Sequence, residues 1–347
     1  MADGDLAGAV ARPGKMEWLL RVAAVACWAL ALGLLAAHTL SWKSVGPRAP
    51  ALLPPAGEVL AGTAQFRFAV VGDSHGNLDP LDAVLSGAKA DGANLILHVG
   101  DLVGNCAPLD FDWFLEELEE AELAVPLCTV PGNHDGFTEE SDPQLRNRLY
   151  SRSFGPRRYW FAYANALFVA FDNTGKRVED EDLQWLDETL GRLRRQFEAC
   201  FVYAHRPPIE QGSKYEPNIE HGKVELLRVL AKHRISALFA GHIHDFVEQT
   251  VEGIPVFVTG GSGGRPERPG IPFHYILCHV EPGGAFRVEK REVAVASNEE
   301  HWEERLLVVV PRYMGLRSLF VLMAAGLAFA VLGLLAERRR LRRRLNA

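Results

Sequence analysis

The chain has 347 residues, of which 48% are hydrophobic and 23% are charged, an ordinary composition for a globular protein of one or two domains. The formal net charge is −7, but the C-terminal residues are strongly basic, so the middle of the chain is acidic. This distribution argues against a general nucleic-acid binder, because such proteins present a basic patch or stripe. Five cysteines are too few for a disulfide scaffold. Cys128, Cys200 and Cys278 lie in apolar runs and are predicted to be buried thiols. The sequence does not decide whether one disulfide forms.

The first apolar run lies near the N-terminus. Val22–Ala37 contains no charged residue, and Trp18–Leu20 and Thr39–Leu40 extend it to 18–40, about the length that spans a bilayer, with Arg21 near one end able to snorkel. A cleaved signal peptide is the competing interpretation, since signal peptides share a basic start and an apolar core. No clean A-x-A cleavage site follows, so we predict a transmembrane helix at 18–40 after an N-terminal tail, 1–17.

The second apolar run lies near the C-terminus. Ser318–Ala336 is uninterrupted by any charge, and buried helices seldom run this long without a polar face. We therefore predict a transmembrane helix at 316–336, followed by an Arg-rich tail, 337–347. Positive residues next to a span stay on the cytoplasmic side. The protein is thus predicted to be multi-pass with both termini cytoplasmic, and its middle faces the periplasm, the exterior or a lumen.

Two linkers separate the spans from the middle of the chain. Residues 41–64 are rich in proline and are predicted to form a semi-rigid spacer. Residues 292–315 form the predicted return linker, which leaves 65–291 as the folded extracytoplasmic domain.

Within this domain a short apolar run ends in polar residues five times. The runs are FRFAVVGDSHGN, ANLILHVGDLVGN, AVPLCTVPGNHD, EACFVYAHRPP and ISALFAGHIHD. Continuous apolar runs of this length predict strands buried on both faces. Helix-like segments cover 79–89, 111–122, 180–195 and 223–233. This alternation predicts an α/β fold with function at the strand ends. After residue 246 the short returns between strands predict antiparallel hairpins.

Each of these five strand ends carries potential metal ligands. They are Asp73 and His75, Asp101, Asn133 and His134, His205, and His242 and His244. Oxygen and imidazole ligands without thiolate are typical of a hydrolytic Mn, Fe or Zn site rather than a structural zinc site. The set is too large for one tetrahedral ion. It suits two ions that share a bridging carboxylate.

The ordered blocks DSH (73–75), GD (100–101), GNHD (132–135), a lone His205 and GHIH (241–244) resemble the calcineurin-like metallophosphoesterase family. Each block alone is weak, but the ordered set is very specific. The resemblance covers about two thirds of the chain. It implies a four-layer αββα sandwich, with helices outside two β-sheets and the metals at the sheet edge.

The resemblance also implies roles for the individual residues. One metal takes Asp73, His75 and His244, the other takes Asn133, His205 and His242, and Asp101 bridges them. His134 is not a ligand in this scheme and contacts the phosphate and the leaving group. Asp135 is expected to orient His134 as a partner behind the site.

The chain departs from two branches of the family. The Ser/Thr protein phosphatases continue their second block to D-R-G, which "GDLVGN" lacks. Purple acid phosphatases place a Tyr three residues after the bridging Asp, where this chain has Gly104, and they lack the histidine present here as His75. We therefore expect neither type, and the chain looks more like the branches that act on small phosphodiesters and phosphomonoesters.

The expected chemistry follows from two nearby cations, which lower the pKa of a bridging water and clamp the phosphate oxygens. The resulting hydroxide attacks phosphorus in line, while the metals, His134 and Arg206 stabilise the developing charge. Protonated His134 would protonate the leaving alkoxide. Asn77 and Asn105 follow ligand blocks and are candidate phosphate contacts. The glycine-rich segment 260–264 with Arg265 either cradles an anion through its backbone amides or is a flexible loop.

Three hypotheses follow. The leading one is a membrane-anchored, two-metal phosphoesterase acting on a phosphoester small molecule, with diester and monoester not separated by the motifs. The alternative is a lipid head-group phosphodiesterase acting on a lipid-linked phosphate, because two anchors would hold the site near the bilayer. The remote alternative is a non-catalytic surface module. Non-catalytic members usually lack some of the metal ligands, whereas this sequence has a ligand residue at every position of the five blocks.

Overall fold

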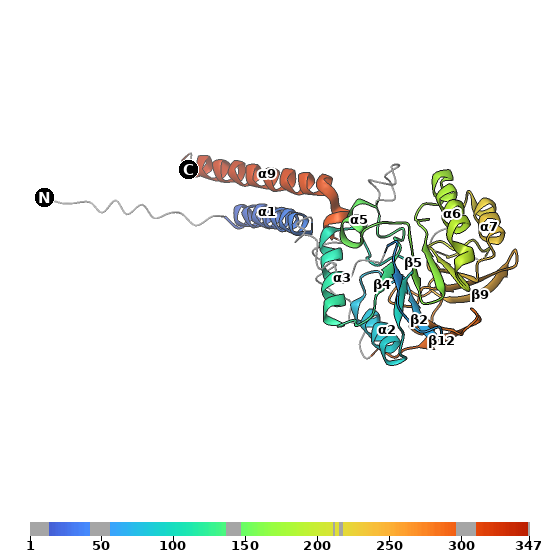
Figure 1. Ribbon diagram of the computed structural model, residues 1–347. Coiled ribbons are helices and arrows are strands. Elements are labelled where there is room, and N and C mark those ends of the chain that lie inside the picture. Colours follow the sequence, from blue (N-terminus) through green and yellow to red (C-terminus); the bar gives the residue numbers. More distant parts are fainter. Residues whose placement is uncertain are drawn as a thin grey trace. The chain divides into compact units, whose positions relative to one another are not determined.

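A computed structural model describes residues 14–41, 56–136, 147–210, 212–214, 218–295 and 310–345. The chain divides into two compact units, one formed by the two ends and the other by residues 43–301 (Figure 1). Most of the predicted N-terminal tail and most of both predicted linkers lie outside the described residues.

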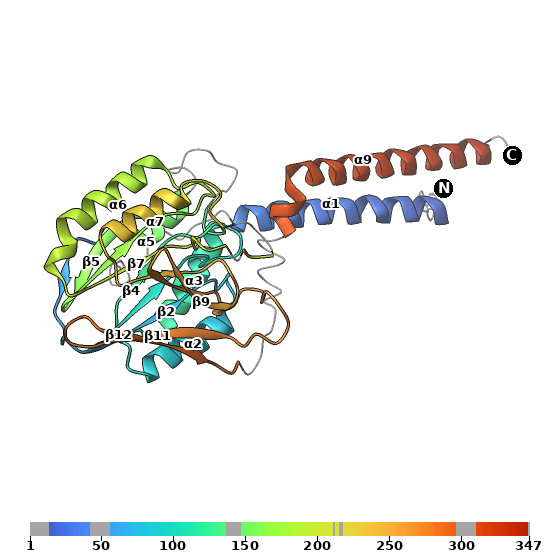
Figure 2. The same ribbon diagram turned by 90° about the vertical axis from the view of Figure 1, so that its right-hand side faces the viewer.

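The terminal unit consists of two long helices, α1 (Lys15–Ser41) and α9 (Val310–Leu345). Each contains a stretch long and apolar enough to cross a membrane, Lys15–Ala36 and Phe320–Arg343. The two helices lie side by side and antiparallel (Figures 1 and 2). By length and composition, these are the two apolar helices that the sequence predicts.

The larger unit contains two β-sheets. Sheet A has the order β1 (Val59–Leu60), β5 (Tyr159–Tyr163), β6 (Ala166–Ala170), β7 (Ala199–Tyr203), β8 (Ala237–Ala240), β10 (Ile254–Thr259), β9 (Phe246–Val251). Sheet B has the order β12 (Phe286–Glu292), β11 (His274–Val280), β2 (Phe66–Val71), β3 (Leu95–His98), β4 (Leu127–Thr129).

Helices cover the outer face of each sheet, giving four layers (Figure 2). Helices α2 (Leu78–Ala90) and α3 (Pro108–Glu120) pack on sheet B, next to the short α5 (Arg148–Phe154). Helices α6 (Asp180–Leu193) and α7 (Lys223–Lys232) pack on sheet A, and a 3-10 turn, η2 (Arg194–Gln196), follows α6. The predicted αββα sandwich is therefore confirmed.

Three apolar layers hold these elements together, and strand β2 shows how. Phe68 and Val70 face the core between the two sheets, whereas Ala69 and Val71 face the helices outside sheet B. All four side chains are fully buried. A strand between two apolar layers has no solvent-facing side, which explains why β2 is continuously apolar from Phe68 to Val71 rather than alternating.

Parallel pairing brings the predicted ligand positions to one edge of each sheet. Strands β2, β3 and β4 are parallel neighbours in sheet B, and β7 and β8 are parallel neighbours in sheet A. Because parallel strands end on the same side of a sheet, the five polar blocks gather where the two sheets end together.

Some elements were not predicted from the sequence. The hairpin β5–β6 and helix α5 lie between the third and fourth ligand blocks, where no element was expected. Strand β1 lies in the predicted linker 41–64, yet it pairs with β5 and belongs to sheet A. The late antiparallel hairpins β9–β10 and β11–β12 were predicted and are present.

Candidate metal centre

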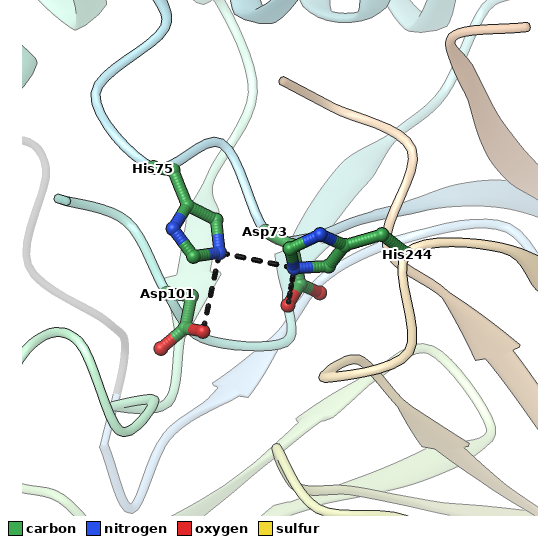
Figure 3. Close-up of side chains that lie close together, drawn as sticks. All are labelled: Asp73, His75, Asp101 and His244. Carbon is green, nitrogen blue, oxygen red and sulfur yellow. Dashed lines mark hydrogen bonds and ion pairs between the residues drawn. The ribbon is translucent and has the colours of Figure 1, made fainter. Parts of the chain in front are cut away.

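The first candidate cluster joins the ends of β2, β3 and β8. Asp73, His75, Asp101 and His244 each offer one ligand atom, and these atoms lie within 4.8 Å of one another (Figure 3). His75 Nε2 lies 3.4 Å from Asp101 Oδ2 and 3.1 Å from His244 Nε2. His244 Nε2 in turn lies 3.4 Å from Asp73 Oδ1. The four side chains therefore converge on one point from three different strands.

The second candidate cluster joins the ends of β4, β7 and β8. Asn133 Oδ1 lies 2.9 Å from His205 Nε2 and 3.0 Å from His242 Nδ1. All three side chains are buried. This amide oxygen and two imidazole nitrogens are the three predicted ligands of the second metal.

Asp101 connects the two clusters. Its Oδ2 atom lies 3.4 Å from His75 Nε2 in the first cluster and 3.4 Å from His205 Nε2 in the second. Its other oxygen, Oδ1, accepts a hydrogen bond from the His134 backbone N–H at 2.7 Å. One carboxylate oxygen thus stands between the two groups of ligands, the geometry that a bridging carboxylate requires.

Backbone carbonyls set the orientation of two histidine rings. His205 Nδ1 lies 2.9 Å from the Val99 carbonyl oxygen, and His244 Nδ1 lies 2.6 Å from that of Arg265. In the neutral ring, an Nδ1–H that donates to a carbonyl leaves Nε2 as the unprotonated nitrogen, the tautomer that binds a metal. In both rings this Nε2 faces a carboxylate of the site.

The electrostatics of the site favour a cation. Burial opposes ionisation of Asp73 and Asp101, yet neighbouring histidines outweigh it and hold the pKa of both carboxyl groups below the usual value. Burial lowers the pKa of His244, but the Asp73 carboxylate outweighs this effect and raises it to about 9. Burial, assisted by His205 and Arg206, lowers the pKa of His242 to about 3.

These residues fit divalent metal ions. Asp73 and Asp101 are ionised and buried, and a buried charge needs a partner, which either a protonated imidazole such as that of His244 or a metal ion supplies. The donor atoms are carboxylate and amide oxygens and imidazole nitrogens, the set preferred by Mn, Fe and Zn in hydrolytic sites.

His134 lies beside the first cluster without joining it. Its ring centre lies 4.4 Å from that of His75, and its Nδ1 lies 2.8 Å from the Gly104 carbonyl oxygen. The predicted orienting partner, Asp135, instead accepts hydrogen bonds from the backbone N–H groups of Val103 (2.9 Å) and Gly132 (2.8 Å). Gly104 therefore orients His134, and Asp135 ties two ligand loops together. Burial and the nearby Asp101 raise the pKa of Asp135 to about 7.

The predicted substrate contacts differ in their surroundings. Asn77 donates through Nδ2 to the Gly263 carbonyl at 3.2 Å, and the Asn105 backbone N–H donates to Asp110 at 3.1 Å. Arg265 is exposed. Arg206 is only 2% exposed, and its guanidinium contacts His242. A phosphate contact by any of the four predicted residues stays a prediction.

The glycine-rich segment 260–264 is hydrogen-bonded to the end of β2. The Ser262 N–H donates to the Gly72 carbonyl at 3.1 Å, and the Gly264 N–H donates to the Asp73 carbonyl at 2.6 Å. Ser262 Oγ also accepts from the Gly72 N–H. These contacts fit neither a flexible loop nor an anion cradle built from these two amides. The segment supports Asp73.

The groups that hold the ligands leave no signal in the sequence. The carbonyls of Val99, Gly104 and Arg265 orient three histidines, and no residue type marks such a carbonyl. His98 is also buried behind the ligands, and its Nε2 lies 3.2 Å from Ser74 Oγ.

Comparison with known proteins gives a family match. The model of the calcineurin-like phosphoesterase family matches residues 66–246, more than half of the chain, and this range includes all five blocks. A probable cyclic nucleotide phosphodiesterase from Fibrobacter succinogenes is 22% identical over 173 residues, which cover 48% of this chain and 63% of that protein. Purple acid phosphatase 23 from Arabidopsis thaliana is 26% identical over 180 residues, 45% of this chain and 38% of that protein. This chain thus spans less than two thirds of each relative.

A solved structure shows the same fold. Purple acid phosphatase PPD1 from yellow lupin (Lupinus luteus) seeds superposes with a TM-score of 0.55 at 16% identity, over 67% of this chain and 52% of that one. At this identity the likeness concerns the fold. The expectation that this chain is not itself a purple enzyme, based on Gly104 and His75, stays a prediction.

Proposed function

This chain belongs to the calcineurin-like phosphoesterase family, and on that premise we propose that it hydrolyses phosphoesters with two divalent metal ions. The observation that carries the proposal is the position of Asp101 Oδ2, 3.4 Å from a histidine nitrogen of each cluster. A single-metal site would not need a carboxylate oxygen between two separate groups of ligands.

The contacts support two metal positions. The first is formed by Asp73, His75 and His244, the second by Asn133, His205 and His242, and Asp101 serves both. Mn, Fe and Zn suit these oxygen and imidazole donors. When bound, such ions supply Lewis-acid activation of the phosphoester and of the attacking water.

His134 is the residue placed to move a proton. Its Nδ1 is engaged by the Gly104 carbonyl, so Nε2 is the nitrogen available to a substrate. Protonated at Nε2, it would donate to the oxygen of the leaving group. Its backbone N–H is fixed on Asp101 Oδ1, which ties the position of this proton donor to that of the bridging carboxylate.

The proposed substrates are small phosphodiesters or phosphomonoesters. The two apolar helices favour a second candidate, a lipid head-group phosphodiester, because an enzyme anchored at the bilayer meets lipid phosphates at high local concentration. Both candidates use the same metal centre and differ only in what approaches it.

We further propose that α1 and α9 form one antiparallel hairpin in the membrane. Small residues allow two helices to approach closely. Gly326 lies against Trp28, where an added Cβ would meet the ring at 2.9 Å, and Gly333 lies opposite Leu20. Two ion pairs close one end of the hairpin, Arg340 with Glu17 at 3.0 Å and Arg21 with Glu337 at 2.7 Å.

These ion pairs join the start of α1 to the end of α9, so both ends lie on the same side. The Arg-rich end of α9 favours the cytoplasm for that side. The catalytic domain, which lies between the two spans in the sequence, would then be extracytoplasmic.

The test of activity uses the full chain in detergent, supplied with Mn²⁺, Fe²⁺ or Zn²⁺. Hydrolysis of bis(p-nitrophenyl) phosphate and p-nitrophenyl phosphate is compared between wild type and Asp101→Ala. Asp91→Ala is the matched control, because Asp91 is paired with Arg291 and Tyr275 and with none of the candidate ligands. We expect metal-dependent turnover that is lost only in Asp101→Ala, and the preferred ester distinguishes diesterase from monoesterase. Turnover of a micellar phospholipid alone would select the lipid candidate, and a chain that binds no metal would refute the proposal.

The test of the hairpin uses a disulfide. The Leu20 Cβ lies 3.6 Å from the position of a Cβ built at Gly333, within the range that a disulfide requires. We expect the double variant Leu20→Cys, Gly333→Cys to form a disulfide in membranes. The protein should also stay in the membrane fraction after extraction with alkaline carbonate. The pair Leu32→Cys with Gly333→Cys should not form a disulfide, since Leu32 lies about 18 Å further along α1 than Leu20, at 1.5 Å per residue. Equal cross-linking of both pairs would contradict the hairpin.

A further inference from the structure

The loop after β6 contains none of the candidate ligands, yet it holds the segment that carries one of them. Asn173 Oδ1 accepts hydrogen bonds from the backbone N–H groups of His205 and Arg206, both at 2.9 Å. Its Nδ2 donates to the Arg206 carbonyl at 2.7 Å. One side-chain amide therefore fixes the backbone of both residues just beyond the end of β7.

Asn173 is itself held rigidly. It is 2% exposed. The preceding Asp172 closes a tight turn around it, since Asp172 Oδ1 accepts from the Thr174 backbone N–H at 3.0 Å and from its hydroxyl at 2.6 Å. The other Asp172 oxygen is paired with Arg157. The asparagine amide thus has little freedom to follow a displaced His205.

The same loop reaches a second histidine through Arg206. Arg206 Nε donates to the Thr174 carbonyl at 3.0 Å, and its Nη1 lies 3.0 Å from His242 Nε2. His205 Nε2 and His242 Nδ1 are the two nitrogens that meet Asn133 Oδ1. Both imidazoles of the second metal position are therefore anchored to residues 173 and 174, one through its backbone and one through Arg206.

We propose that Asn173 is a positioning residue for the second metal position and has no such role at the first. The inference rests on the proposed two-metal function. In the described part of the chain the hydrogen bonds of Asn173 go to His205 and Arg206, and none goes to Asp73, His75 or His244.

An asparagine is required because its amide offers two acceptor lone pairs and a donor on one planar group. Aspartate would keep both acceptor contacts, but it would place a carboxylate oxygen against the Arg206 carbonyl, two acceptors facing each other. Alanine would leave two buried N–H groups without their partner, which is costly.

The experiment is a Mn²⁺ titration of the full chain in detergent, with bound metal counted by equilibrium dialysis and the paired ions detected by electron paramagnetic resonance. In Asn173→Ala we expect the first Mn²⁺ to bind as in wild type and the second to bind 10- to 100-fold more weakly, the usual effect of removing a partner behind a ligand. Excess Mn²⁺ should restore the spin-coupled signal and most of the turnover. If Asn173 served only the fold, excess Mn²⁺ would restore neither the spin-coupled signal nor the turnover.

Ser236→Ala is the matched control. Ser236 Oγ accepts from the Cys200 backbone N–H at 3.0 Å, near the start of the same strand β7, so this variant also removes a side-chain acceptor from a backbone N–H. It acts at the end of β7 remote from the metal centre. We expect both Mn²⁺ affinities to stay at wild-type values in this variant.

Asn173→Asp is the second variant, and it should also weaken the second Mn²⁺ while sparing the first. Wild-type affinity for both ions in either folded variant would overturn the inference, as would equal weakening of both ions. Failure of both variants to fold would overturn it too, because Asn173 would then serve the domain rather than one metal position. A wild-type chain that binds two Mn²⁺ but hydrolyses neither ester would refute the proposed function alone, and the binding comparison would still decide the role of Asn173.

Discussion

Replacing Gly264 with alanine should weaken the first metal position without unfolding the protein. A Cβ at residue 264 would lie 2.8 Å from His244 Cε1, 2.9 Å from His244 Nδ1 and 3.0 Å from the Asp73 carbonyl oxygen. No ordinary contact is shorter than about 3.4 Å, so the ring must move by roughly 0.6 Å. His244 cannot simply swing away, because its Nδ1 is fixed on the Arg265 carbonyl.

The size of the effect follows from this displacement. A misplacement of about 1 Å in a catalytic constellation costs about 100-fold in rate, so we expect a loss of roughly tenfold in turnover and in affinity for the first metal ion. Overpacking of this kind also costs about 1–3 kcal/mol of unfolding free energy. Both quantities are measurable, by Mn²⁺ titration with ester hydrolysis and by thermal melting.

The matched control is Gly191→Ala in helix α6. A Cβ there would meet only His233 at 3.5 Å, an ordinary contact, and alanine in a helix interior is more favourable than glycine by about 0.5–1 kcal/mol. This variant should bind metal with wild-type affinity, and its melting temperature should be slightly higher than that of wild type. If Gly264→Ala shows the metal affinity and turnover of Gly191→Ala, the close approach of residue 264 to His244 does not constrain the site.

Three further predictions test other parts of the molecule. His134→Ala should keep both metals, because residue 134 is not a ligand, and should lose about 100-fold or more of turnover; loss of metal would contradict its assignment. Phe68→Ala should cost about 3–5 kcal/mol of unfolding free energy, since Phe68 is fully buried against three rings between the sheets, and a melt unchanged from wild type would contradict that packing. Burial, with Asp82 and Glu120 nearby, raises the pKa of Glu117 to about 7 from 4.5, so wild-type stability should fall as pH rises from 4.5 through 7. Glu117→Gln should therefore be more stable than wild type by about 1 kcal/mol at pH 8, a value reduced for solvent screening, and equal to it at pH 4.

The ligand-bearing strands could be predicted from the sequence because two signals coincide in each. Strand β8 is a continuous apolar run, which indicates burial on both faces, and the block with His242 and His244 follows it at once. Strand β2 repeats this combination before Asp73. A buried strand fixes where the next residues emerge, so the polar block is placed by the strand as well as by its own composition.

Strands without a ligand block were harder to predict. The β5–β6 hairpin consists of two apolar runs around Ala164 and Asn165, which lack the glycine of the common two-residue hairpin turns, and no polar block follows it. Strand β1 has only two residues and pairs with a strand about a hundred residues further along the chain. Such a pairing depends on the assembled sheet and leaves no local pattern.

The same limit applies within the site. The ligands are side chains with a recognisable chemistry and could be listed from the sequence. The groups that orient them are backbone carbonyls, such as that of Val99 on His205, and a distant amide, Asn173. Asn173 precedes His205 by more than thirty residues, and only the parallel pairing of β6 with β7 brings the two together.

The backbone at the ligand positions explains why the site needs a large core behind it. Asp73, His75, Asp101 and His242 all have positive φ, at 58°, 52°, 54° and 70°. The left-handed region costs an L-residue roughly 1–2 kcal/mol, so four such residues cost at most on the order of 4–8 kcal/mol, since aspartate and histidine tolerate this region better than most residues do. Glycine would remove this cost but would also remove the ligand. Since a whole domain is stable by only about 5–15 kcal/mol, this strain persists only because the three apolar layers offset it. The strand ends are thus held in a conformation that their own residues disfavour, and the ligands converge as a consequence of the fold.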